Sequence, residues 1–122
     1  MAMTKKELEK RTKKFSHDCV KVALSLPDGT LGRHIRGQLI RCSTSVAANY
    51  RAVNLAHSKA AFAAKLSIVL EEADESGFWL EFATDENLLL ESVSAPLIRE
   101  SFELTSIFIA SRKTIQTEGN NK

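Results

Sequence analysis

The chain has 122 residues, of which 43% are hydrophobic and 26% are charged, and its net charge is +2. This length and composition predict one soluble globular domain. No apolar run reaches about 18 residues, so we expect no membrane span. The lysine-rich N-terminus has no apolar segment behind it, which argues against a signal peptide and favours a cytoplasmic location.

The charges are divided unevenly along the chain. Residues 1–70 hold 13 Lys and Arg against 4 Asp and Glu, whereas residues 71–122 hold 4 against 11. Residues 29–70 contain no acidic side chain, and residues 71–98 contain no basic one. Two interpretations stay open: the halves neutralise each other within or between subunits, or the basic half faces a polyanion.

The first predicted helix covers residues 4–26. Its apolar positions recur at alternating steps of three and four, the spacing of one helix face. These positions are Leu8, Thr12, Phe15, Cys19, Val22 and Leu26. The segment 27–29 (Pro-Asp-Gly) cannot continue a helix, so we expect a tight turn there, with Thr30 as the next N-cap.

The second predicted helix covers residues 30–56. Its inner positions are Leu31, Ile35, Leu39, Cys42, Val46, Asn49, Val53 and Ala56. Its other faces carry small uncharged residues, although Ser and Thr are mediocre helix formers. Either close packing within the bundle or the approach of another chain explains them, and they are Thr44, Ser45, Ala47 and Ala48.

Cys19 and Cys42 are expected to be reduced core thiols. The turn near residue 28 offsets them by ~7 Å along helices that are themselves ~8–10 Å apart. A disulfide requires Cα atoms within about 7 Å, so no bridge is predicted.

The third predicted helix covers residues 58–84, with Ser58 as its N-cap. Its inner positions are Phe62, Leu66, Val69, Ala73, Ser76, Leu80 and Ala83. The fourth covers residues 90–116, after a connection at 84–87. Its inner positions are Leu97, Ser101, Leu104, Phe108, Ser111 and Ile115.

Pro96 falls near the start of the fourth helix. Its missing N–H costs little there if Ser92 is the N-cap, whereas a helix that began near Leu88 would be kinked. Short connections between long helices force antiparallel neighbours. We therefore predict a single all-α domain over residues 1–122, an antiparallel up-down-up-down four-helix bundle.

The third and fourth helices carry more large apolar residues than one inner face can use. A surplus of this kind is unusual on a monomer. We therefore predict self-association, with an interface that includes Phe78, Trp79, Phe82, Phe102 and Ile109.

Asn49 is placed on the inner face, where a buried amide needs hydrogen-bond partners. Glu72 and Glu75 lie one turn apart on the third helix, and they are candidates to pair with Asn49, Arg41 or Arg51. We interpret Asn49, Glu72 and Glu75 as a structural polar network that sets helix register.

The basic half suggests binding to RNA or DNA. The candidate residues are Lys5, Lys6, Lys10, Arg11, Lys13, Lys14, Lys21, Arg33, Arg36, Arg41 and Arg51. No aromatic stacking platform accompanies them, so binding would act through the backbone and depend steeply on salt. Two alternatives remain: a merely solvated face, or a protein scaffold that docks a partner enzyme without nucleic acid.

No residue set predicts an enzyme. Arg51 and His57 fit a loose Arg-x5-His spacing of some helical ribonucleases, but Ala52 follows the arginine and the pattern is short. Glu72 and Glu75 lack the histidines that a di-metal bundle site needs. No phosphate loop or dinucleotide motif is present. We expect no catalytic residue, metal or cofactor.

Two segments carry a family resemblance: IRGQLIRCSTSVAANYRAV at 35–53 and AAKLSIVLEEADESGFWLEF at 63–82. They resemble the four-helix-bundle family encoded by intervening sequences of bacterial large-subunit ribosomal RNA genes. The matching positions are Gln38, Leu39, Arg41, Ser45, Val46, Ala48, Asn49, Lys65, Leu66, Ser67, Glu72, Ala73, Glu75, Trp79, Leu80 and Glu81. ASRKT at 110–114 is similar too. Members often have an acidic residue after the Asn-aromatic pair, whereas this chain has Arg51, Ala52 and Val53 there.

The resemblance implies a four-helix bundle that assembles as a ring, commonly a homopentamer. It implies no known enzyme activity and no cofactor. A distantly similar bundle, the accessory protein of diversity-generating retroelements, binds a reverse transcriptase and nucleic acid through a basic surface. That similarity implies a nucleic-acid or protein partner for this chain.

Overall fold

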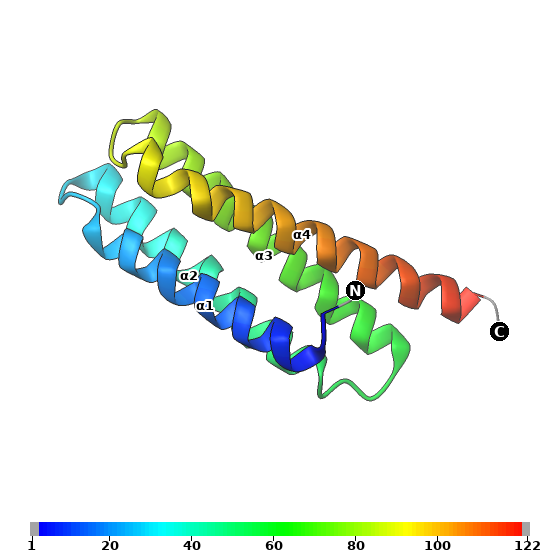
Figure 1. The fold of residues 1–122 in the computed structure, drawn as a ribbon. Helices are drawn as coiled ribbons and strands as arrows, with labels where there is room; N and C mark the ends of the chain where they lie inside the picture. The colour runs from blue at the N-terminus through cyan, green and yellow to red at the C-terminus, as the bar shows by residue number, and fades with distance from the viewer. Residues whose placement is uncertain (1–2, 121–122) are drawn as a thin grey trace.

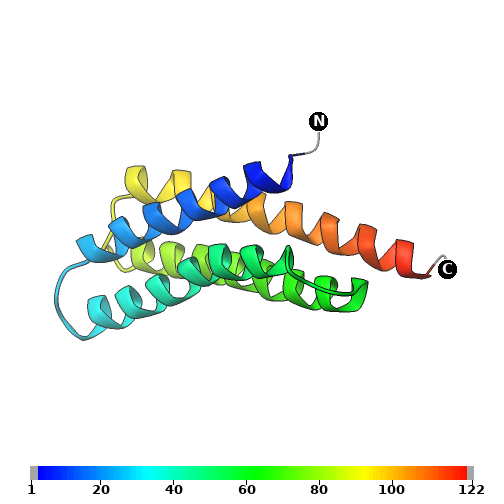
Figure 2. The same cartoon turned by 90° about the horizontal axis from the view of Figure 1, so that it is seen from below.

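The computed structural model describes residues 3–120. Four helices follow one another: α1 (Lys5–Ser25), α2 (Thr30–Val53), α3 (Lys59–Asp85) and α4 (Glu91–Asn120). They form an up-down-up-down bundle in which each helix packs beside the next and α4 returns to α1 (Figure 1). The predicted all-α four-helix bundle is confirmed. Figure 2 shows α1 and α4 side by side, although their contact is the least extensive of the four.

The core is built from one narrow face of each helix. All six inner positions predicted for α1, from Leu8 to Leu26, are buried. α3 buries six of its seven predicted positions, and only Phe62 is half exposed. Phe108 of α4 and Tyr50 of α2 meet in the core with ring centroids 5.3 Å apart.

The inner face of α2 differs from the prediction at both ends. Gly32 is buried where Leu31 was expected, and Leu31 is 37% exposed. Tyr50 is buried in place of Asn49, which is half exposed. The aromatic ring buries more apolar surface than an amide would, so the helix turns Tyr50 inward. α2 also ends at Val53, so residue 56 lies in the following loop.

The helix ends are partly as predicted. Ser58 caps α3, since its Oγ accepts a hydrogen bond from the Ala61 N–H at 3.0 Å. Thr30 is instead the first residue of α2, and the N-cap is Gly29, which makes no side-chain cap hydrogen bond. Gly29 has φ 136°, a conformation that favours glycine.

The α3–α4 connection uses an asparagine. Asn87 has φ 61°, and the Leu88 N–H bonds the Ala83 carbonyl at 2.8 Å, which ends α3 in a left-handed cap. Neither of the two starts considered for the fourth helix is observed, because α4 begins at Glu91, between Leu88 and Ser92. Pro96 therefore lies inside the helix, in its second turn.

Both cysteines are free and buried, as predicted. Burial raises the pKa of the Cys42 thiol to about 11, and burial likewise raises the pKa of Cys19. Cys42 Sγ lies 3.3 Å from the Ser76 Oγ, a contact between α2 and α3. The thiols are therefore protonated core residues at neutral pH.

None of the helices within residues 3–120 combines the length and apolar character that crossing a membrane needs.

Two glycines permit close backbone approach. A Cβ on Gly32 would overlap the carbonyl oxygen of Pro27, so the first turn of α2 packs directly on the preceding turn. A Cβ on Gly77 would overlap the Ser101 hydroxyl, which marks a close crossing of α3 and α4. Gly37, by contrast, faces open space.

We predict that Gly32→Ala lowers the free energy of unfolding by about 1–3 kcal/mol, because backbone must shift to accept the methyl group. Gly37→Ala is the matched control in the same helix. It should raise stability by about 0.5–1 kcal/mol, since alanine is the better helix former. Urea unfolding followed by circular dichroism measures both, and equal effects of the two changes would contradict the packing described.

Candidate nucleic-acid interface

The cationic residues predicted to bind nucleic acid fall into two groups. Arg11, Arg36 and Arg41 are engaged with partners inside the bundle. The others are exposed on α1 and α2.

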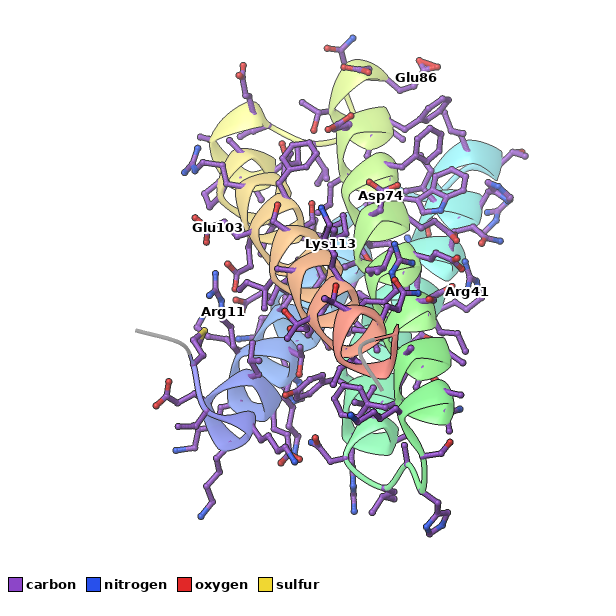
Figure 3. All side chains as sticks on the ribbon, turned by 90° about the vertical axis from the view of Figure 1, so that its right-hand side faces the viewer. Arg11, Arg41, Asp74, Glu86, Glu103 and Lys113 are labelled. Carbon is purple, nitrogen blue, oxygen red and sulfur yellow. The ribbon has the colours of Figure 1, made fainter. Side chains whose placement is uncertain are left out.

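Arg11 joins α1 to α4. Its Nε donates to Glu100 at 2.7 Å, and its Nη2 donates to Glu100 and to Glu103, each at 2.6 Å. The hydrogen bond to Glu100 raises the pKa of the Arg11 guanidinium, and Glu103 adds to the effect. Figure 3 shows Arg11 and Glu103 on the same side of the bundle. Arg11 is therefore a link between helices.

Arg36 closes the C-terminal end of α1. Its Nη2 donates to the Leu26 carbonyl at 2.6 Å and lies 3.3 Å from Asp28 Oδ1, while its Nε reaches the Ala23 carbonyl at 3.4 Å. A cation at a helix C-terminus satisfies carbonyls that lack helical partners. This position is structural.

Arg41 joins α2 to α3 through both predicted carboxylates. It donates to Glu72 at 3.0 Å and also binds Glu75, which accepts from the Trp79 indole at 3.0 Å. Figure 3 shows Arg41 at the edge formed by α2 and α3.

Asn49 does not belong to this cluster, which corrects the predicted network. Its Nδ2 donates to the Ser45 hydroxyl at 2.7 Å and to the Ser45 carbonyl at 3.0 Å, both within α2. The rotation of α2 that buries Tyr50 leaves Asn49 half exposed. It can therefore bond its own helix instead of the carboxylates.

Burial opposes ionisation of Glu75, but the hydrogen bonds from Trp79 and Arg41 outweigh it and lower the pKa of the Glu75 carboxyl. A pKa that is lower in the folded than in the unfolded state stabilises the fold above the unfolded value. That stability is lost as pH falls through the folded value.

We predict that the wild-type protein loses stability more steeply than Glu75→Gln when pH falls below about 4, the ordinary range of a glutamate. Glu71→Gln is the matched control, since Glu71 is exposed on the same helix and pairs with no residue in the described part of the chain. Thermal unfolding between neutral pH and pH ~3 measures the difference. A Glu75→Gln profile that followed the wild type throughout would contradict the prediction.

Four members of the second group lie along one edge of α1. Lys6, Lys10, Lys14 and Lys21 follow steps of four and seven, so their side chains lie along the outer side of α1, here called the lysine stripe. His17 falls within the stripe by the same spacing, and the sequence reasoning missed it. Lys14 pairs with Asp18 of its own helix at 2.7 Å, an exposed contact. Within residues 3–117 the remaining predicted cations make no ion pair, and they are Lys5, Lys6, Lys10, Lys13, Lys21, Arg33 and Arg51.

Acidic residues of α1 lie beside the stripe. Glu9 faces α2, where its carboxylate accepts from the Asn54 amide at 2.8 Å. Glu7 and Asp18 are interleaved with the stripe, since Glu7 lies three residues before Lys10 and Asp18 pairs with Lys14. The outer side of α1 thus carries more positive than negative charge, and among the described residues its unpaired lysines are Lys6, Lys10 and Lys21.

A groove runs between α1 and α2 beside the stripe. It is lined by Glu9, Lys13, Thr44, Ala47, Ala48 and Arg51. Thr44 and Ala48 are exposed, so packing within the bundle does not account for these two small side chains, whereas Ala47 is half buried. Ser43, which is fully buried, is the residue used for the close α1–α2 contact, since its carbonyl accepts from the Ser16 hydroxyl at 2.5 Å.

The residues predicted for an oligomer interface divide into an exposed group and a half-buried group. Phe78, Phe102 and Ile109 are 51%, 54% and 43% exposed. Trp79 and Phe82 are half buried in an aromatic cluster of their own chain, with ring centroids 6.1 Å apart. His34 meets the Trp79 ring edge-on at 5.4 Å.

The structure also locates the residues considered for catalysis and for metal binding. No group of three or more His, Cys, Asp and Glu side chains in residues 3–117 is placed to hold a metal ion. His57 is exposed in the loop between α2 and α3, and Arg51 is exposed near the end of α2.

Comparison with known proteins identifies the chain's relatives. The family model of the 23S rRNA-intervening sequence protein matches residues 4–110. A crystal structure of a protein of unknown function from the S23 ribosomal protein family of Bacteroides thetaiotaomicron shares 25% identity, with a TM-score of 0.78. The match covers 87% of this chain and 98% of that one. No curated protein matches. The chain therefore belongs to the 23S rRNA-intervening sequence protein family.

Proposed function

We propose that this chain is a non-enzymatic accessory protein that binds the phosphate backbone of RNA or DNA through the lysine stripe of α1 and acts as a homo-oligomer. The observation that carries the proposal is the stripe itself. It combines several exposed lysines on one helix edge, whereas the arginines nearer the helix contacts are bound inside the fold.

The stripe has the dimensions of a backbone contact. Lys6 and Lys21 are separated by about 22 Å at ~1.5 Å per residue. Double-stranded DNA carries one charge per ~1.7 Å of axis with both strands counted, so this length of duplex carries roughly a dozen phosphates, of which the stripe faces those on one side. Flexible lysine side chains can reach several of them without a fixed register.

The chemistry of the stripe supports backbone and not base recognition. Its members are lysines and one histidine, so it offers no stacking platform comparable to those of single-strand binding proteins. Contacts to phosphate position a protein without reading sequence. The proposed binding therefore does not discriminate between nucleotide sequences, and its affinity falls strongly as the salt concentration rises.

Self-association would add to this affinity. Each copy contributes a short stripe, and several linked stripes on one polyanion act at a high effective concentration. A closed ring of copies, which the family resemblance leads us to expect, would hold its stripes in a fixed arrangement.

The test compares two double variants that remove the same charge. Lys10→Gln/Lys21→Gln alters the stripe, and Arg99→Gln/Lys113→Gln alters exposed positions on α4. We predict weaker binding to duplex RNA or DNA for the stripe variant only. For this variant, the slope of log affinity against log salt concentration should be smaller in magnitude by about 2, because two phosphate contacts are lost.

Fluorescence anisotropy over a salt series provides the measurement. No binding by the wild type at low salt would reject nucleic-acid binding and leave a protein scaffold as the alternative. Equal losses in the two variants would show that net charge, and not the stripe, governs binding.

A further inference from the structure

One histidine lies within the lysine stripe of α1. His17 is exposed, and no side chain or backbone group in the described part of the chain pairs with its ring. Residues three, four and seven positions away lie beside it on the same helix face. Two of these positions hold Val20 and Leu24. The other four are all lysines, namely Lys10, Lys13, Lys14 and Lys21.

The carboxylates of α1 and α4 beside this edge are engaged by other cations. Asp18, the next residue along the chain, pairs with Lys14 at 2.7 Å. On the α4 side, Arg11 binds Glu100 and Glu103, each at 2.6 Å. These contacts leave positive charge in excess around the imidazole.

The neighbouring helix α2 adds no carboxylate, because residues 29–70 contain no Asp or Glu. On the side of α2 that faces α1, Arg36 binds the C-terminal end of α1, and Arg51 borders the groove beside Lys13. A phosphate group that approaches the outer edge of α1 therefore meets the imidazole of His17 together with lysines.

The other two histidines of the chain are placed differently. His34 meets the Trp79 ring edge-on at 5.4 Å, on the α2–α3 side of the bundle. His57 is exposed in the loop between α2 and α3. His17 is therefore the histidine that shares a helix face with the stripe, and His57 supplies a matched control.

We propose that His17 is a further contact residue for the nucleic-acid backbone and that its protonation strengthens the binding. The inference rests on the proposed function of the lysine stripe. Among protein side chains, histidine is the one that ordinarily gains its charge between pH 8 and pH 5. Lysines stay charged over that whole range. Within the stripe, only position 17 therefore changes its charge.

Binding and protonation favour each other at this position. An opposite charge close to a titratable group stabilises its charged form, so a phosphate over the stripe favours the imidazolium. Because linkage is reciprocal, protonation of His17 raises the affinity by the same factor. The affinity for nucleic acid therefore rises as the pH falls through the range in which histidine titrates.

A salt series at two pH values tests the role of His17. Each phosphate neutralised adds about 0.9 to the magnitude of the slope of log affinity against log salt concentration for B-form DNA. With duplex DNA, the wild-type slope should therefore be steeper by up to about 0.9 at pH ~5.5 than at pH ~7.5. Fluorescence anisotropy measures the affinities, and circular dichroism checks that each variant is folded at both pH values.

Two substitutions fix the charge at this position. His17→Gln stays neutral, so its slope should keep the shallower value at both pH values. His17→Lys stays charged, so its slope should match the steeper value at both. His57→Gln, the control, removes a histidine from the loop and should retain the pH dependence of the wild type.

The outcomes separate this inference from the proposed function. Wild-type binding whose slope is the same at both pH values overturns the role of His17 and leaves the stripe as the binding site. Full pH dependence in His17→Gln, or its loss in His57→Gln, overturns that role as well. If the wild type does not bind duplex DNA at low salt at either pH, the proposed function fails and this inference fails with it.

Discussion

The structure depends on how narrowly each helix is buried. Small residues at the helix crossings, Ser16 against Ser43, Cys42 against Ser76 and Gly77 against Ser101, let the backbones approach closely. The core is then filled by one face per helix, with Phe15 and Phe108 as its largest fully buried side chains. Everything outside that face is left to solvent or to a partner.

The narrow buried face of each helix also determines which charged side chains find partners within the bundle. Arginines that fall beside a helix contact are bound to carboxylates or carbonyls of a neighbouring element, as at Arg11, Arg36 and Arg41. Lysines on the outer edge of α1 have no neighbouring helix to reach. Arg11, Arg36 and Arg41 thus hold the bundle, for which the planar guanidinium is the better multidentate donor. Arg33 and Arg51 are exposed without an ion pair among the described residues, like most lysines of α1.

Much of the fold follows from spacing alone. All six positions that the step pattern predicts for α1 are buried, and the pattern missed only the small buried residues Ser16 and Ala23. α2 is harder, since Asn49 and Tyr50 are adjacent and both fit the spacing within half a turn. Only packing against Phe108 decides between them. The start of α4 was left open by the sequence, between a helix near Leu88 and one capped by Ser92, and the observed helix begins at Glu91.

The sequence predicted the type of candidate site, a basic surface, but not which basic residues are free to bind. The sequence placed the basic residues on the first two helices, but it could not separate those bound to Glu72, Glu75 or Glu100 from those left free. That separation depends on which helix lies beside each cation.

Amide chemical-shift mapping by NMR, with a short RNA or DNA duplex added at low salt, tests the central claim most directly. The account predicts shifts concentrated on the outer edge of α1 from Lys6 to Lys21, which disappear as salt is raised. Shifts centred on the α3–α4 face, or no shifts at low salt, would contradict it.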